Sequence, residues 1–326
     1  MEQKQELKPL LAERMENLLG KDFQKFKEIL RKEPPKSIRC NTLKMTPEEL
    51  KKRLTKKSWK IKQPFKSNPE IMIVENEIAP GELGRSIEHL LGYYYVQDIS
   101  SMLPIIALNP KPEETVLDLC AAPGSKTTQA AAKMENSGTL IANELSLGRV
   151  KILASNTERC GVTNMIITKK EGYLLCKKLK EKGFLFDKIL IDAPCSGEGT
   201  LRSSKMTHKM WNIHTVKKLS GVQKNLLTSA IEILKPGGEI VYSTCTHSPE
   251  ENEEVINLIL RKFKDIKIEK LSLPSELKTN PGILGWKDKE YLEDVKYSCR
   301  IYPQDNDTEG FFIAKLKKEE AKEITR

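Results

Sequence analysis

The first hundred residues alternate between helical and extended patterns of apolar positions. Apolar residues recur near a 3.6-residue period from the N-terminus to about residue 33, which predicts a helix that Pro34 and Pro35 end. Strands are predicted over residues 37–43, 58–62 and 71–74. Thr46, followed by a proline and then by Glu49, forms a capping box that predicts a helix start. We therefore expect a small α+β unit over residues 1–100.

From about residue 112 the pattern changes to short apolar strands that alternate with helices. The predicted strands cover residues 115–119, 138–144, 165–168, 187–192 and 238–243, and the predicted helices cover 126–134, 147–159, 174–181 and 216–234. This alternation is typical of an α/β fold with a doubly wound, mostly parallel sheet. Little helix separates two last strands, 266–269 and 310–316, so we expect the last strand to be antiparallel. The expected division is a larger domain over 101–318 and a charged tail over 319–326.

The chain is basic, with 55 Lys and Arg against 45 Asp and Glu, a formal net charge of +10 and a pI near 9.1. A basic balance favours a polyanionic partner, although lysine-rich solubility explains it equally well. The seven cysteines are scattered and form no CxxC pair, so neither a zinc site nor a disulfide framework is indicated. The N-terminus is hydrophilic, and no apolar run approaches the length of a membrane span. We expect a monomeric cytoplasmic protein without metal or membrane segment, whose thiols are free to react.

The turn after the first strand of the larger domain, CAAPGSKTT over residues 120–128, is suited to ligand binding. Small residues let the backbone approach a ligand where a strand becomes a helix, although neither GxGxxG nor the phosphate-loop pattern is present. Glu144 ends the second strand, 20 residues after Gly124, where a carboxylate suits ribose hydroxyls. Glu171 offers a second acceptor after the third strand. Because carboxylates also suit a sulfonium, the pattern favours S-adenosylmethionine; the alternative is that both glutamates are solvated surface charge.

Two cysteines follow the ends of two strands in this domain. Cys195 comes just after the fourth strand, three residues beyond Asp192, and Cys245 comes just after the fifth. Open α/β sheets bind ligands outside the carboxyl ends of their strands, so we expect both thiols to face the crevice beside residues 120–126. Both could instead be inert, because free cysteine is a common core residue.

A methyl donor, two thiols and a carboxyl group together suit methylation of carbon 5 of cytosine. That carbon is a poor nucleophile until a thiolate adds to carbon 6 and converts the ring into an enamine. An acid near ring nitrogen 3, such as Asp192, stabilises the charge that develops there. The second thiol is suited to help release the product, and Lys126 could lower a thiol pKa or fix the acid. The residues alone do not decide which cysteine attacks.

Five motifs, in order, resemble those of the Nop/Sun family of RNA cytosine-5 methyltransferases and span residues 38–316. They are RCN at 39–41, DLCAAPGSKT at 118–127, DAPCSG at 192–197, STCT at 243–246, and RIYP at 300–303 with TEGFF at 308–312. The resemblance implies a Rossmann-like S-adenosylmethionine-dependent methyltransferase domain preceded by a small RNA-recognition-like domain. It implies that Cys245 is the nucleophile, that Cys195 assists product release, and that Asp192 contacts the cytosine and borders the cofactor.

The resemblance also implies which residues line the pocket for S-adenosylmethionine. They are Cys120, Ala121, Ala122, Pro123, Gly124, Ser125, Lys126, Glu144, Arg149, Glu171 and Asp192. Two positions depart from the family pattern, since Ser125 stands where glycine is usual and Glu171 stands where aspartate is usual.

Basic residues in two parts of the chain are candidates for contacts with RNA phosphates. They are residues 51–53 and 56–57 in the small domain, and Arg202, Lys205 and Lys209 after the Cys195 loop. Trp211 is a candidate for stacking on a base. Solvated charge and core packing are the alternatives. We expect RNA as the partner, with tRNA favoured over rRNA.

Two other functions stay open at this point. A DNA cytosine-5 methyltransferase would use Cys195 as its nucleophile, but the sequence has no Glu-Asn-Val run and no large target-recognition insertion. A non-catalytic RNA-binding factor for ribosome assembly would keep a vestigial pocket, although this chain retains Lys126, Asp192 and both cysteines.

Overall fold

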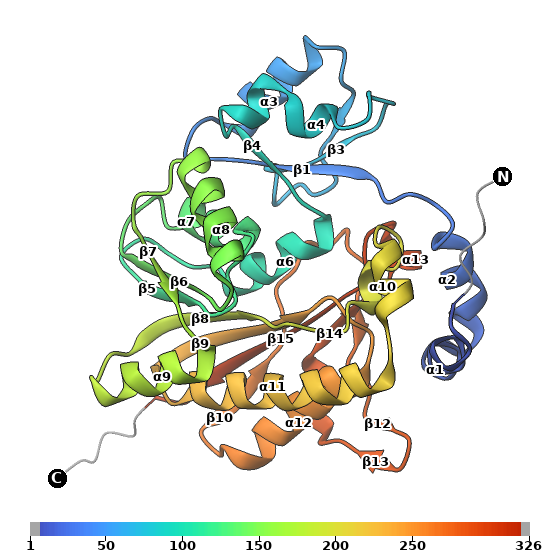
Figure 1. Cartoon of the computed structure of the whole chain (residues 1–326), viewed down its shortest axis with the longest axis vertical. Coiled ribbons are helices and arrows are strands. Elements are labelled where there is room, and N and C mark those ends of the chain that lie inside the picture. Colours follow the sequence, from blue (N-terminus) through green and yellow to red (C-terminus); the bar gives the residue numbers. More distant parts are fainter. Residues whose placement is uncertain (1–6, 321–326) are drawn as a thin grey trace.

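A nine-stranded sheet forms the centre of the computed structural model, which describes residues 7–320 (Figure 1). Its strands are β5 (Thr115–Asp118), β6 (Thr139–Glu144), β7 (Met165–Lys169), β8 (Phe186–Asp192), β9 (Leu234–Thr244), β10 (Ile266–Glu269), β11 (Asn280–Pro281), β14 (Cys299–Ile301) and β15 (Phe311–Lys318). They lie in the order β11-β14-β15-β9-β8-β5-β6-β7, and β10 pairs with β15. Strands β5 to β9 pair in parallel, whereas β15 is antiparallel to β9, β10 and β14. The predicted α/β fold with an antiparallel last strand is confirmed.

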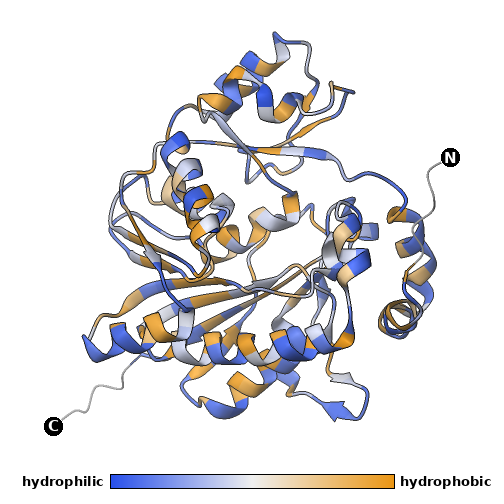
Figure 2. Cartoon of the chain, viewed as in Figure 1, coloured by the Kyte–Doolittle hydropathy of each residue, from blue (hydrophilic) through white to orange (hydrophobic). Residues whose placement is uncertain are grey.

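Helices cover both faces of this sheet, over separate hydrophobic cores (Figure 1). One face carries α6 (Ile99–Leu108), α7 (Ser125–Lys133) and α8 (Leu147–Cys160), and the other carries α9 (Gly172–Glu181), α11 (Ile213–Ile231) and α12 (Glu253–Lys262). Apolar and polar residues alternate along α11, which buries Val216, Leu227 and Ile231 (Figure 2). Because β5, β8 and β9 are parallel neighbours, the loops that follow them leave the sheet at one edge.

The small N-terminal unit is a four-stranded antiparallel sheet in the order β2-β3-β1-β4. Its strands are β1 (Lys36–Cys40), β2 (Ile61–Lys62), β3 (Ile71–Val74) and β4 (Tyr94–Val96), and its helices are α3 (Pro47–Thr55), α4 (Glu82–Arg85) and α5 (Ile87–Leu90). The predicted capping box starts α3. The Glu49 N–H donates to Thr46 Oγ1, and the Thr46 N–H donates to the Glu49 carboxylate.

The N-terminal helical segment is broken into two helices. They are α1 (Pro9–Leu19) and α2 (Phe23–Ile29), with a 3-10 turn over Gly20–Asp22 between them, and residues 1–6 of the predicted helix lie outside the described residues. Gly20 has a φ of 52°, a left-handed conformation that ends α1. Both helices pack against the larger unit, since Leu11 of α1 and Phe26 of α2 share a core with Trp211.

The hydrophobic pattern does not predict several of the observed elements. These are α4, α5, α6, α12, β4, β11, β14, α10 (Lys205–Met210), α13 (Pro303–Asn306) and the hairpin of β12 (Gly285–Trp286) and β13 (Lys289–Glu290). The strands expected over 37–43 and 58–62 are also shorter than predicted. Helix α6 runs across the boundary expected at residue 100, and its buried residues join the core under α7. The division into domains stays a prediction.

Candidate active site

The loops after β8 and β9 bring the two predicted cysteines into contact. Asp192 at the end of β8 lies opposite Ser243 of β9, so both loops begin at the same level of the sheet. The sulfur of Cys195 lies 3.2 Å from the sulfur of Cys245. Both are free, partly exposed thiols. The two thiols therefore share one crevice, as the carboxyl-end rule predicts.

The Cys195 thiol shares one hydrogen bond with the Cys245 thiol, in which either sulfur can be the donor. Its hydrogen bond to the Cys245 sulfur, followed by burial, raises the pKa of Cys195 well above that of a free thiol. The backbone fixes the same loops. The Gly199 N–H donates to the Cys245 carbonyl at 2.8 Å, and the Gly310 N–H donates to the Gly199 carbonyl at 2.9 Å. The two cysteine loops and the residue before β15 thus form one hydrogen-bonded strip.

Asp192 forms an ion pair with Lys126 at the base of the Cys195 loop. Lys126 Nζ lies 2.7 Å from Asp192 Oδ2 and donates to Ser101 Oγ at 2.8 Å. Ser243 Oγ donates to Asp192 Oδ1 at 2.8 Å. The Lys126 side chain is 7% exposed and that of Asp192 is 30% exposed, so the carboxylate is the partner that solvent reaches. Lys126 Nζ also lies 5.1 Å from the centre of the Phe311 ring. These contacts orient the carboxylate from one side.

The turn between β5 and α7 is tied to its neighbours through its backbone. The Ala121 N–H donates to the Asn143 carbonyl at 2.8 Å, and the Arg149 guanidinium donates to the Ala122 carbonyl. The Pro123 carbonyl accepts from the side chain of Asn156 at 2.9 Å. Gly124 has a φ of 108°, and a Cβ there would lie 3.1 Å from a Leu153 methyl carbon. A side chain at Gly124 would therefore be strained, and Ser125 begins α7 directly after it.

Carboxyl groups end the first two strands beside this turn. Glu144 is buried, and it accepts from the Ser146 N–H at 2.9 Å and lies 3.4 Å from Arg149. Asp118 accepts from Thr127 Oγ1 at 2.7 Å through one oxygen, whereas its buried Oδ1 has no partner among residues 7–320. Burial raises the pKa of Asp118 to about 7. A buried carboxyl oxygen without a partner fits a site that receives a polar ligand.

Two predicted pocket residues have other surroundings. Glu171 is exposed at the N-cap of α9 and makes no capping hydrogen bond through its side chain. Burial, followed by the Asp118 charge, raises the pKa of Cys120 well above that of a free thiol, so Cys120 stays protonated.

Sequence reasoning missed several residues that contact the predicted site. Ser243 and Asp118 belong to the motifs quoted above and lie at strand ends, so the sequence could have identified both as site residues. Ser101 lies on α6, and Glu251 ends the 3-10 turn over Pro249–Glu251 and accepts from the Ser196 N–H at 3.0 Å. Neither belongs to a motif, and only the tertiary fold brings them to the site.

Two candidates for contact with RNA have buried side chains, so Trp211 follows the core-packing alternative and the phosphate contact predicted for Arg202 is wrong. Trp211 is 3% exposed, and its Nε1 donates to Glu198 at 2.7 Å, so it packs under α1 and α2 and does not offer a face to a base. The Arg202 side chain is 0% exposed; it donates to the Thr308 carbonyl and pairs with Asp307 at 2.8 Å. Lys205 and Lys209, on α10, are exposed as predicted.

The basic residues of the small unit divide into two groups. Lys51, Lys52 and Lys56 are exposed. Arg53 and Lys57 both pair with the buried Glu88, at 2.9 Å and 2.7 Å. The second group therefore has a structural partner, and the first is available to a phosphate.

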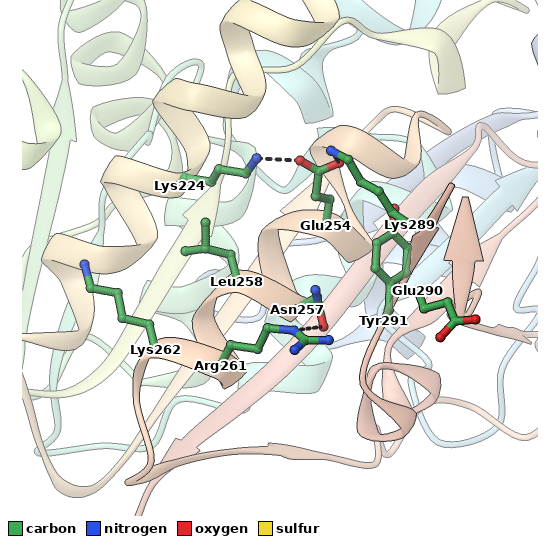
Figure 3. Close-up of a pocket in the computed structure, with 9 residues that line it drawn as sticks. All are labelled: Lys224, Glu254, Asn257, Leu258, Arg261, Lys262, Lys289, Glu290 and Tyr291. Carbon is green, nitrogen blue, oxygen red and sulfur yellow. Dashed lines mark hydrogen bonds and ion pairs between the residues drawn. The ribbon is translucent and has the colours of Figure 1, made fainter. Parts of the chain in front are cut away.

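A separate pocket of about 510 Å³ lies between α11, α12 and the β12–β13 hairpin (Figure 3). Lys224 and Lys289 point into it from opposite sides, and each pairs with Glu254 at 2.8 Å. The predicted site residues do not line it. Within residues 7–320, no helix is long and apolar enough to cross a membrane, and no cluster of three or more His, Cys, Asp and Glu residues could hold a metal ion.

Comparison with known proteins identifies the family of this chain. Residues 105–317 match the family model of the 16S rRNA methyltransferase RsmB/F, and residues 7–99 match the N-terminal domain of 16S rRNA methyltransferase RsmF. The chain belongs to the RsmB/F family. This family comprises S-adenosylmethionine-dependent RNA cytosine-5 methyltransferases, so the predicted resemblance, cofactor and RNA substrate class are confirmed. Membership of an RNA-modifying family also argues against the DNA alternative.

Two relatives act on different RNAs. The tRNA (cytosine(49)-C(5))-methyltransferase of Pyrococcus abyssi is 41% identical over 98% of this chain and 99% of its own length. The ribosomal RNA small subunit methyltransferase F of Aliivibrio salmonicida is 42% identical over 88% of this chain, and the match spans 58% of that protein.

Two solved structures share the fold over almost the whole of this chain. A methyltransferase homolog from Pyrococcus horikoshii superposes with a TM-score of 0.83 and 36% identity, over 97% of this chain and 96% of that chain. NSun6 from Pyrococcus horikoshii, in complex with SFG, superposes with a TM-score of 0.81 and 26% identity, over 96% and 99%.

Proposed function

We propose that this protein methylates carbon 5 of a cytosine in tRNA, with Cys245 as the nucleophile and Cys195 as the thiol that assists product release. The single observation that carries the proposal is the 3.2 Å contact between the two sulfurs at adjacent strand ends. The near full-length alignment with the tRNA enzyme of Pyrococcus abyssi supports tRNA as the RNA class.

In the first step, the Cys245 thiolate adds to carbon 6 of the cytosine, and the ring electrons shift so that carbon 5 becomes nucleophilic. Asp192 contacts the polar edge of the ring, and Lys126 holds Asp192 in place at 2.7 Å. Asp192 acts as the acid and passes a proton to nitrogen 3, which offsets the negative charge that develops there, while the Lys126 ammonium stabilises the carboxylate left behind. This proton returns to Asp192 when the ring is restored. Bound S-adenosylmethionine supplies the methyl group as a methyl sulfonium.

In the second step, the carbon 5 proton leaves and the bond between carbon 6 and the Cys245 sulfur breaks. Cys195 takes the carbon 5 proton as it passes its own proton to the departing sulfur of Cys245, and the double bond between carbons 5 and 6 reforms. The raised pKa of Cys195 and its hydrogen bond to Cys245 support this relay. The net result is one proton moved from carbon 5 to the Cys245 sulfur.

The turn over residues 120–126 forms the cofactor pocket in this proposal. Glu144 contacts the ribose hydroxyls, Arg149 orients Glu144 and the turn, and Glu171 contacts the adenine. The unpaired Asp118 Oδ1 and the tight glycine turn support this placement. The small unit binds RNA through exposed lysines such as Lys51 and Lys56. The proposal also includes that the protein acts as a monomer in the cytoplasm and uses no metal ion.

Two cysteine variants test the roles of the thiols. The Cys245→Ala variant is expected to form no 5-methylcytosine, because no group remains to attack carbon 6. The Cys195→Ala variant is expected to accumulate a covalent protein–RNA adduct, visible as a slow band on a denaturing gel. If the adduct accumulates in Cys245→Ala and not in Cys195→Ala, the assignment of the two thiols is wrong.

Bisulfite sequencing of cellular RNA, with and without the gene, tests the substrate class. Loss of 5-methylcytosine from a tRNA supports the proposal, whereas loss from rRNA alone refutes the tRNA assignment. If the purified protein transfers no labelled methyl group to bulk RNA, the non-catalytic RNA-binding alternative is favoured instead.

A further inference from the structure

The residues on both sides of Cys195 are tied to one buried carboxylate. Glu251 is 0% exposed. It accepts from the Ser196 N–H at 3.0 Å and from the Ser196 hydroxyl. On the other side, Gln223 Nε2 donates both to the Pro194 carbonyl and to Glu251 Oε1, each at 2.9 Å. Cys195 therefore lies between two residues, Pro194 and Ser196, that are both linked to Glu251 by hydrogen bonds.

The same contacts reach the second cysteine. Ser196 Oγ lies 2.8 Å from Oγ1 of Thr246, the residue after Cys245. Glu251 itself is fixed through its backbone, because the Tyr242 hydroxyl donates to its carbonyl at 2.6 Å. Tyr242 belongs to β9, which leads directly into Cys245. Glu251 is therefore anchored to β9, the strand that leads into Cys245, and its carboxyl group is hydrogen-bonded to the loop that carries Cys195.

We propose that Glu251 is a positioning residue that, through Ser196 and Gln223, holds the Cys195 thiol against the Cys245 sulfur for product release. This inference rests on the proposed function of the two thiols. Glu251 does not touch the reacting atoms. A carboxyl group suits the task because its two oxygens accept several donors at once.

Loss of the hydrogen bonds to Glu251 should slow product release more than it slows the addition of Cys245 to carbon 6. The Cys195 thiol must meet both carbon 5 and the departing sulfur, so a small displacement slows release. Addition of Cys245 to carbon 6 depends on β9 and its loop, which the Gly199 N–H and the Asn252 side chain also hold through hydrogen bonds that do not involve the Glu251 carboxyl group. Geometric misplacement of this kind reduces rates by about a hundredfold in well-ordered sites.

Ser196→Ala and Glu251→Gln test the inference, with Ser298→Ala as the matched control. Ser298 is also a buried serine, and its hydroxyl donates to the Val295 carbonyl at 2.7 Å, in a part of the fold separate from the Pro249–Glu251 turn and from both cysteine loops. The assays are single-turnover methyl transfer, multiple-turnover product formation, and covalent adduct on a denaturing gel, each with tRNA and S-adenosylmethionine.

For both test variants we expect multiple-turnover rates to fall at least about tenfold, with adduct accumulating and single-turnover transfer changed less than about threefold. Ser298→Ala is expected to match the wild type. If the test variants release product at the wild-type rate, or lose both steps equally without adduct, the inference is overturned. Failure of the wild-type protein to methylate any RNA would instead refute the proposed function, so the two failures are distinguishable.

Discussion

The ion pair between Arg14 and Glu250 allows a quantitative test of how α1 is attached to the larger unit. Arg14 donates to both carboxylate oxygens, at 3.0 Å and 2.6 Å, and also to Ser248 Oγ at 3.2 Å. The two side chains are 6% and 14% exposed. Removal of one partner from such a buried pair leaves an uncompensated charge and costs about 3–5 kcal/mol. We expect Arg14→Met and Glu250→Gln each to lower the free energy of unfolding by an amount in this range.

The double variant is the decisive measurement, because it removes both charges together. Since no buried charge is then left alone, its loss should resemble that of either single variant, which corresponds to a coupling energy of about 3–5 kcal/mol. Urea unfolding followed by tryptophan fluorescence measures all three variants. Lys25→Met, which removes an exposed pair with Asp22, is the control and should not change stability measurably. If the two single losses simply add in the double variant, the pair does not attach α1 in the way described.

Two further predictions concern His247 and two glycines. Burial, followed by the Arg300 charge, lowers the pKa of His247 to about 3, below its unfolded value of 6.5, so its contribution to stability is complete above pH 6.5 and is lost as the pH falls toward 3. His247→Phe should therefore gain about 2 kcal/mol relative to wild type between pH 7.5 and pH 5 in urea unfolding, and an unchanged difference would contradict the lowered pKa. A Cβ at Gly310 would lie 2.3 Å from the His247 ring, so Gly310→Ala should destabilise the protein by about 1–3 kcal/mol. Gly221, inside α11, has open space around it, so Gly221→Ala should stabilise by about 0.5–1 kcal/mol, and equal thermal shifts for the two variants would contradict this reasoning.

The parallel strands of the larger domain could be predicted because their burial is regular. β5, β6 and β8 are short apolar runs, bounded by turn residues and separated by amphipathic helices, and this pattern allows few topologies. Helix α6 escapes the same analysis because eight of its ten residues are buried and Pro104 lies inside it. A helix that is apolar all round has no polar face, so its sequence shows no helical period.

The residues of the site could be predicted where they directly follow the end of a strand. They could not be predicted where only the packing of other elements decides their position. Cys195, Cys245 and Asp192 follow β8 and β9 directly, so the order of the strands is enough to bring them together. Glu251 reaches the Cys195 loop from a 3-10 turn, and Trp211 turns inward because α1 and α2 cover it. Nothing in the spacing of these two residues distinguishes a buried partner from an exposed one.

The position of β15 has a consequence for how the protein is made. β15 comes last among the strands, yet it lies between β9 and β14 inside the sheet, and Gly310 before it completes the strip of backbone hydrogen bonds around Cys245. During synthesis β9 therefore presents an unpaired edge until β15 has left the ribosome, and open edges of this kind invite aggregation. A nascent chain that has not reached β15 therefore contains both cysteines but lacks the Gly310 hydrogen bond that holds their loops.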